Sequence, residues 1–380
     1  NPFLALRQIA ALTRIYRREK PDLVHHIAMK PVLYGSVAAW AAGAPRVLNA
    51  FAGLGYVFRA TAPKARLIRP VLLAGFRILF RRKGVWTLFQ NGDDRAGLEK
   101  SGVVVHERTA IIRGSGVDTD HYQVHPLPPV PPFIFVYAGR MIDMKVLPTL
   151  RAAFDILKDT APHIHLWLCG KPDHGTPGSW DEERLAQWCG THRNVTWKGH
   201  QQDMAPIWAQ AHLALQPTWG GEGLPKALLE AGACGRAMVA SDVSGNREIV
   251  IPGRNGFLVP EKDAAALAEA ILQMAEDAGR CAAMGRESRK LIESDMSAQG
   301  GGRQIAALYA RIMEGSGFQQ DADPLNQVEG SVIDDHGDHG ADPARGEHVA
   351  GDQHRKAHQV LQEGRQQGDP RRGDDGGRAL

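Results

Sequence analysis

The 380-residue sequence has no apolar run of the roughly 18 residues that a membrane-spanning helix needs. Cysteine is scarce and scattered, with four residues and no C-x-x-C pair: Cys169, Cys189, Cys234 and Cys281. This pattern indicates reduced, mostly buried thiols in a cytosolic protein rather than a disulfide framework. Aromatic residues make up 7% of the chain, and none lies beyond Phe318.

Both ends of the chain are unusual. From about residue 319 Gly, Asp, His, Gln and Arg dominate, so residues 317–380 cannot bury a core and are expected to be disordered. Five histidines in this tail could form a metal-binding tract, but an unstructured tail is the simpler interpretation: His336, His339, His348, His354 and His358. The chain begins at Asn1 without Met or a signal peptide, which is typical of a fragment that lacks its true N-terminus.

Charge is distributed unevenly along the chain. Residues 1–125 hold 19 Lys/Arg and 8 Asp/Glu, whereas residues 319–380 hold 7 and 13. The basic first third predicts an acidic partner, either nucleic acid or an anionic membrane surface. Residues 64–83 set seven cations around a mostly apolar stripe, a pattern typical of an interfacial helix and also of a packed helix with a solvated basic face. The expected membrane contacts are Arg77, Arg81, Arg82 and Lys83.

Short apolar runs alternate with helical patterns along most of the chain, which predicts parallel sheets covered on both faces. The expected strands are 23–27, 47–51, 85–89, part of 103–112, 133–137, 164–168, 195–197, 213–215 and 237–240. Five prolines within residues 126–132 predict an extended linker. The sequence therefore predicts an α/β protein of two facing domains with a cleft between them, 1–125 and 126–316.

The segment Gly220–Ala231 places two carboxylates, Glu222 and Glu230, around a Gly-rich turn and the start of a helix. Gly223 lets the backbone approach a ligand closely, and Pro225 suits the first helical position. The N–H groups of such a helix end attract an anion such as a diphosphate. At about 1.5 Å per residue the acids lie roughly 12 Å apart, about the reach from the sugar to the ribose of a nucleotide-sugar. Two solvated acids on a surface helix would have the same spacing.

Gly139, Arg140 and Lys145 follow the first strand of the second domain, at the strand end where α/β sheets bind ligands. The two cations could clamp a diphosphate, although solvated surface cations would give the same pattern. The D-x-D at Asp118 and Asp120 could hold Mg²⁺, but it lies at the junction of the two predicted domains, where a structural turn is the favoured interpretation, so no metal is expected. Arg140, Lys145 and the helix N-terminus must then neutralise a leaving diphosphate.

These motifs, with the stretches 239–250 and 253–259, resemble the E-x7-E region of glycosyltransferase family 4, which has the GT-B fold of two Rossmann-like domains. The resemblance implies that Glu222 binds the sugar and Glu230 the ribose. It also implies that Arg140 and Lys145 bind the diphosphate. The family has Gly after this Lys, whereas Val146 stands here. The remaining donor-site residues are expected to be Gly139, Gly223, Leu224 and Pro225.

Segments 30–35, 53–58, 89–94 and 114–118 resemble bacterial members that extend undecaprenyl-diphosphate-linked glycans of O-antigen or capsule type. Many relatives carry H-x-H after the strand that begins with Pro-Asp, which corresponds here to Pro21 and Asp22. Here His25 matches the first position and Ile27 replaces the second, so His26 is an alternative, and a core histidine is an equally open interpretation. The expected acceptor-side residues are His25, His26, Lys30, Gly53 and Gly55. The family's first strand and Gly-rich loop are absent.

The resemblance implies a retaining, metal-independent transferase without a cofactor, which moves a sugar from a nucleotide donor, expected to be UDP-linked, to a lipid-linked glycan. It would act in the cytoplasm, peripherally on the inner face of the cell membrane. The alternatives are a nucleotide-sugar epimerase of the same fold, an inactive fragment and a basic nucleic-acid-binding protein. The last is disfavoured, because aromatics do not interleave with the cations as in a base-stacking platform and the Glu222 motif would go unexplained.

Overall fold

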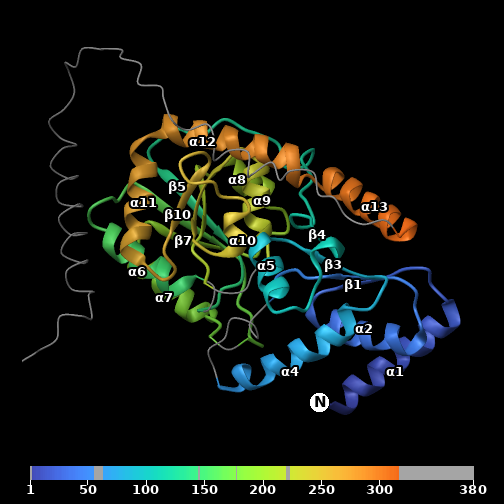
Figure 1. The fold of residues 1–380 in the computed structure, drawn as a ribbon. Coiled ribbons are helices and arrows are strands. Elements are labelled where there is room, and N and C mark those ends of the chain that lie inside the picture. Colours follow the sequence, from blue (N-terminus) through green and yellow to red (C-terminus); the bar gives the residue numbers. More distant parts are fainter. Residues whose placement is uncertain (1, 55–62, 144–145, 177, 220–222, 316–380) are drawn as a thin grey trace, which may run out of the picture.

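The computed structural model describes residues 2–54, 63–143, 146–176, 178–219 and 223–315, and these ranges form two α/β units (Figure 1). The predicted fold class is confirmed, because both sheets are parallel and covered by helices. The first sheet spans residues 24–111 and the second spans 133–259, with the irregular Pro-rich segment 126–132 between them. The tail that was expected to be disordered falls outside the described residues.

Four parallel strands form the first sheet, in the order β1–β2–β3–β4. They are β1 (Val24–Ile27), β2 (Val47–Ala50), β3 (Val85–Phe89) and β4 (Thr109–Ile111). Every residue of β2 and β3 is buried, as expected for parallel strands covered on both faces. One face packs against α1 (Pro2–Glu19), α2 (Met29–Ala42), α4 (Pro63–Phe80) and α5 (Gly92–Lys100). The other face packs against α13 (Ala298–Glu314), which returns from the far end of the described chain.

The strand expected within residues 103–112 is shorter than the apolar run suggests. Val103 and Val104 are buried in the same core cluster as Phe76 and Phe80 of α4, outside the sheet. The 3-10 helix η1 (His106–Arg108) follows, and only Thr109–Ile111 pairs with β3. Apolar content alone therefore marked this segment as buried without showing where sheet pairing begins.

Six parallel strands form the second sheet, in the spatial order β7–β6–β5–β8–β9–β10. They are β5 (Phe133–Ala138), β6 (Ile164–Cys169), β7 (Val195–Gly199), β8 (Leu213–Gln216), β9 (Ala237–Ser241) and β10 (Gly256–Val259). The chain moves outward from β5 in one direction and then from β8 in the other. The point between β5 and β8 is therefore a topological switch point, where open α/β sheets bind ligands.

Helices cover both faces of the second sheet. One face packs against α6 (Leu147–Leu157), α7 (Glu182–Thr191) and α11 (Ala264–Glu276). The other packs against α8 (Ala205–Ala209), α9 (Lys226–Ala233) and the π-helical segment η2 (Ile292–Met296), and α12 (Ala278–Leu291) contributes to both cores. The short helix α10 (Ser244–Arg247) follows β9 at its carboxyl end.

Short polar side chains determine where several helices begin. Each of five such side chains accepts a hydrogen bond from the backbone N–H three residues later: Asn91, Asp181, Asp263, Asp277 and Ser297. Such N-caps contribute about 1 kcal/mol each, because they satisfy a donor that the helix itself leaves unpaired. They begin α5, α7, α11, α12 and α13.

The cysteine prediction is confirmed in its structural part. Cys169, Cys234 and Cys281 are buried, Cys189 is half-buried, and all four are unpaired thiols. Burial raises the pKa of Cys234 to about 11, so it is an inert packed group. Within the described ranges, no helix is both long and apolar enough to cross a membrane.

His212 is a buried histidine that joins the second sheet to the Pro-rich segment. Its Nδ1 accepts a hydrogen bond from the backbone N of Ile134 (3.0 Å), and its Nε2 donates to the carbonyl O of Pro128 (3.1 Å). Because a backbone N–H can only donate, Nδ1 must be unprotonated and the ring neutral. Burial lowers the pKa of His212 from 6.5, against the opposing effect of the Pro128 hydrogen bond.

We expect the free energy of unfolding to be fully developed above about pH 6.5 and to fall below it, because the unfolded chain then binds a proton that folded His212 does not. His212→Asn keeps an acceptor near the Nδ1 position and does not titrate. Urea unfolding at about pH 7.5 and about pH 5.5 should therefore show a smaller acid-induced loss in the variant than in the parent. If the free energy of unfolding falls equally in the parent and the variant, a group other than His212 controls its pH dependence.

Candidate active site

The carboxyl ends of the strands in the two sheets face each other, and we call the loops that follow these strands the facing edges. Gln90, directly after β3, accepts a hydrogen bond at Oε1 from the backbone N of Leu224, after β8 (3.2 Å). The backbone N of Gly92 donates to Oε1 of Glu248, after β9 (2.9 Å). Because ligands of α/β sheets bind at the carboxyl ends of the strands, these loops form the candidate site.

At Gly223 the backbones of the two edges lie close together. A Cβ atom at this position would lie 2.8 Å from the carbonyl O of Ala52 and 2.1 Å from Oε1 of Gln90. Sequence analysis explained this glycine by the approach of a ligand, whereas here the approach is to the first domain. Pro225 is the N-cap of α9 rather than its first helical residue, because the helix begins at Lys226.

Gly139 and Arg140 follow β5, beside the switch point that α9 flanks on the β8 side. The Arg140 guanidinium is half exposed and donates through Nη1 to Oδ2 of Asp173, which lies after β6 (3.0 Å). Hydrogen bonds from Thr176 and then Arg140 lower the pKa of Asp173, so the carboxylate stays ionised. An anionic ligand that reaches Arg140 would compete with this carboxylate.

Glu230 lies in α9 with a side chain that is only 8% exposed, beside Lys226 Nζ at 3.5 Å. The Tyr122 hydroxyl, from the connection between the domains, is the second partner. Burial raises the pKa of Tyr122, and the charge of Glu230 and its hydrogen bond raise it further, so the phenol stays protonated. The structure therefore holds Glu230 in place from two sides, in the middle of α9.

Three predicted site residues, Lys145, Glu222 and Gly55, lie outside the described residues. The structural turn at the D-x-D is confirmed, because Asp118 Oδ1 accepts hydrogen bonds from the backbone N of Asp120 (2.9 Å) and His121 (3.1 Å). In the part of the chain that the structure describes, no three His, Cys, Asp or Glu side chains are grouped to hold a metal ion.

The two acceptor-side histidines are held inside the first domain. His26 is buried, with Nδ1 at 2.8 Å from Asn49 Oδ1 and Nε2 at 3.1 Å from the Tyr16 hydroxyl. His25 Nδ1 lies 2.7 Å from the hydroxyl of Tyr309 in α13. Both therefore fit the core interpretation, and burial lowers the pKa of each.

Lys30 and Gly53, two of the predicted acceptor-side residues, lie at the facing edge of the first sheet. Lys30 is exposed at the start of α2, directly after β1. Gly53 follows β2 with φ of 98°, a conformation that favours glycine. The next residue, Leu54, donates its backbone N–H to Oδ2 of the buried Asp94 (3.1 Å), which fixes this loop against α5.

The predicted membrane segment both packs and exposes apolar side chains. Phe76, Leu79 and Phe80 of α4 are buried, whereas Leu67 and Ile78 are more than 70% exposed. The four predicted cations lie in its last turn and just after it, and one of them, Arg77, donates to the carbonyl O of Ser101 (2.6 Å). The buried side chains show that part of this helix packs against the first domain, and its contact with a membrane remains a prediction.

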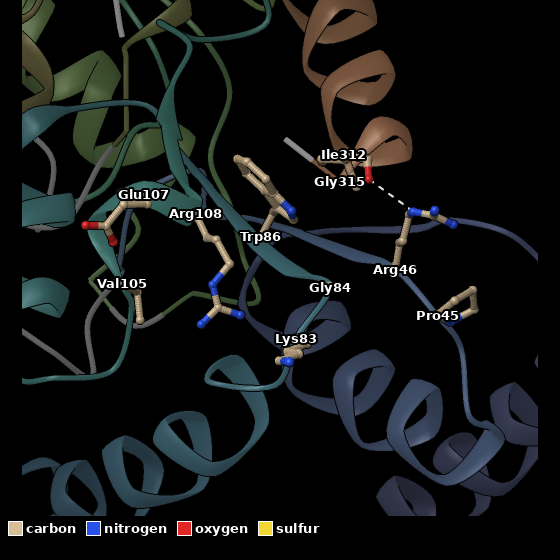
Figure 2. A pocket seen from close by; sticks show the side chains of 10 residues that line it. All are labelled: Pro45, Arg46, Lys83, Gly84, Trp86, Val105, Glu107, Arg108, Ile312 and Gly315. Atoms are coloured by element: carbon tan, nitrogen blue, oxygen red, sulfur yellow. Dashed lines mark hydrogen bonds between the residues drawn. The ribbon is translucent and has the colours of Figure 1, made fainter. Parts of the chain in front are cut away.

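A separate cavity of about 600 Å³ lies at the opposite, amino ends of the first sheet's strands (Figure 2). Arg46, Lys83, Trp86 and Arg108 are among its lining residues. Arg46 donates to the carbonyl O of Ile312 near the end of α13 (3.0 Å), and Arg108 donates to backbone carbonyls just after α4. These arginines thus stabilise helix C-termini, away from the facing edges.

Sequence analysis gave no role to a charged cluster that joins the domains. Arg113, after β4, donates through Nε to Oε2 of Glu248 (2.7 Å) and through Nη1 to Oδ2 of Asp295 (2.9 Å). Glu248 lies within a stretch that resembles the family, and Arg113 directly precedes another. The sequence marked both stretches, but only the folded chain shows that residues 135 and 182 positions apart meet.

Two family models match the chain. Residues 132–277 match the model described as glycosyl transferases group 1, and residues 1–83 match glycosyl transferase 4-like. Among solved structures, Anabaena Alr3699/HepE in complex with UDP is 20% identical, with a TM-score of 0.67 over 80% of this chain and 81% of that one. The fold is therefore GT-B, with a glycosyl transferases group 1 domain at residues 132–277 and a glycosyl transferase 4-like domain at residues 1–83.

Two relatives with named activities are each 25% identical to this chain over the matched residues. The Staphylococcus aureus capsular polysaccharide biosynthesis glycosyltransferase CapM is 25% identical over 48% of this chain and 47% of its own length. N,N'-diacetylbacillosaminyl-diphospho-undecaprenol alpha-1,3-N-acetylgalactosaminyltransferase of Campylobacter jejuni is 25% identical over 73% of this chain and 74% of its own. For four of the curated relatives, one of which is CapM, the chain spans only between 10% and 51% of the relative's own length.

Proposed function

We propose that this protein transfers a sugar from a UDP-linked donor to a hydroxyl of a lipid-linked glycan, with retention at the anomeric carbon and without a metal ion. The observation that carries the proposal is the position of Arg140 and the N-terminal end of α9 on the two sides of the switch point, facing the first domain. The complex of Alr3699/HepE with UDP and the name of the Campylobacter relative support the donor and the acceptor class.

The donor site would use residues of the second domain. Arg140 and Lys145, with the backbone N–H groups at the start of α9, would stabilise the diphosphate as negative charge develops on it. Glu230 would accept hydrogen bonds from the ribose hydroxyls, and Glu222 from the sugar. The leaving phosphate would take the proton of the acceptor hydroxyl on the same face of the sugar, a step that needs no separate base.

The acceptor side would be the first domain, and its outer helices suit a lipid-linked substrate. α1 and α4 both cover the same face of the first sheet (Figure 1). Both expose large apolar side chains: Leu4, Leu6 and Ile15 from α1, and Leu67, Ile68, Val71 and Ile78 from α4. Together with the basic charge of residues 1–125, these side chains favour an anionic membrane surface.

We expect UDP to bind to the protein, and Glu230→Gln to weaken this binding by about 1–3 kcal/mol, roughly 5- to 150-fold in Kd. Glutamine keeps the shape of the buried side chain. It removes the negative charge and replaces one of the two oxygens that would accept the ribose hydrogen bonds by an NH2 group. Isothermal titration with UDP measures the effect. Lys226→Gln is the matched control, because it removes the exposed partner and leaves the carboxylate in place. Unchanged affinity in Glu230→Gln would exclude Glu230 from the site.

Release of UDP from UDP-sugars in the presence of an undecaprenyl-diphosphate-linked acceptor tests the transfer itself. We expect turnover to persist in excess EDTA, because the site cations neutralise the diphosphate. Loss of turnover in EDTA with recovery on adding Mg²⁺ or Mn²⁺ would overturn the metal-free mechanism. Absence of UDP release with every donor in a broad panel would overturn the proposed function.

The membrane expectation is tested by co-sedimentation with vesicles. The protein should bind anionic vesicles, more at low salt than at high salt, and should not bind neutral ones. Each cation near the surface contributes about 1 kcal/mol, so replacing Arg77, Arg81, Arg82 and Lys83 by Gln should reduce binding more than tenfold and leave UDP affinity intact. A control with the same charge change replaces Lys158, Arg193, Arg286 and Arg303, which are exposed elsewhere. Equal binding by both variants would show that α4 is an ordinary packed helix.

A further inference from the structure

We infer that Arg113 restrains rotation about the hinge between the two domains and thereby determines the relative orientation of their facing edges. We assign it a positioning role, which it exerts through two carboxylates of the second domain, Glu248 and Asp295. Its effect on transfer rests on the proposed function, whereas its effect on the domain arrangement does not.

The first observation is where the chain crosses between the domains. It leaves the first sheet after β4 and returns to it through η2 and α13. The two crossings pair side by side, with Val117 N donating to the carbonyl O of Met296 (3.0 Å) and Ala298 N donating to the carbonyl O of Val117 (2.9 Å). Gly116 has φ of 73°, and a Cβ there would lie 2.5 Å from Cα of Ala298. The two crossings therefore form one close-packed hinge.

The second observation is that Arg113 lies at this hinge with its charge buried. Its side chain is 10% exposed, and those of Glu248 and Asp295 are 13% and 20% exposed. The guanidinium fork reaches one carboxylate on each side, a geometry that a lysine ammonium cannot reproduce with the same fixed directions. Removal of Arg113 would leave two partly buried carboxylates without this neutralising cation, which destabilises the arrangement that buries them.

The third observation connects the hinge to the facing edges. Oε1 of Glu248 accepts from the backbone N of Gly92, at the start of α5, while its other oxygen accepts from Arg113. One carboxylate of the second domain is therefore held by two separate groups of the first. A rotation about the hinge would have to break these bonds together, so Arg113 and Glu248 favour one arrangement of the domains.

A neighbouring pair provides the control. Arg247 Nη1 lies 2.9 Å from Asp93 Oδ2, which also joins the two domains. These side chains are 49% and 57% exposed, so water and salt screen the attraction. Loss of this exposed pair should hardly change the domain arrangement, whereas loss of Arg113 should.

The test measures the distance between spin labels at Lys100→Cys and Lys158→Cys, one in each domain, with Cys189→Ala to avoid labelling of the half-buried thiol. We expect one narrow distance distribution in the parent and in Asp93→Asn, and a broad distribution extended to longer distances in Arg113→Met. Glu248→Gln should give an intermediate broadening, and this variant replaces Arg113→Met if that protein does not fold. Parent-like distributions in Arg113→Met, or in Glu248→Gln when it is the substitute, would overturn the inference.

A comparison of UDP affinity with kcat distinguishes a positioning role of Arg113 from damage to the donor site. UDP affinity of Arg113→Met should stay within about twofold of the parent, because the proposed donor groups belong to one domain, whereas kcat should fall at least tenfold. A matched loss of UDP affinity and of kcat would mean that Arg113 acts on the donor site itself. The distance measurement needs neither substrate nor activity, so failure of the proposed function would leave the hinge tested on its own.

Discussion

The arrangement of this molecule depends on the close approach of the two carboxyl edges at Gly223. The backbone there touches Ala52 and Gln90 of the first domain, and no side chain fits between them. The neighbouring Leu224 donates its N–H to Gln90, so the start of α9 is fixed against the first domain. A ligand at the switch point would therefore lie between two domains that already touch, which suits the proposed donor on the second domain and the proposed acceptor on the first.

The cations of the chain serve different purposes, and their contacts distinguish them. Arg46 and Arg108 stabilise helix C-termini at the far end of the first sheet. Arg113 neutralises two partly buried carboxylates at the hinge. Arg140 is half exposed at the switch point, and its guanidinium donates to the edge carboxylate of Asp173. An anionic ligand would compete with Asp173 for this guanidinium.

Sequence reasoning predicted the two α/β domains and most strands, because buried parallel strands such as Val85–Phe89 are continuous apolar runs. It also placed Gly139, Arg140 and Glu230 correctly relative to strands and helices. It could not assign Gln90, Arg113 or Glu248, because their roles come from contacts between residues more than a hundred positions apart. For His25 and His26, residue type suggested chemistry, whereas Tyr309, Asn49 and Tyr16 engage them inside the first domain.

Hydrogen exchange of backbone amides with and without UDP tests the central claim most directly. If the donor binds at the switch point, UDP should slow exchange at Gly139–Met141, at the start of α9 and at Asp242–Glu248, and should leave the amino ends of the first sheet unchanged. Protection confined to the cavity around Arg46 and Arg108, or no protection at saturating UDP, would contradict the account.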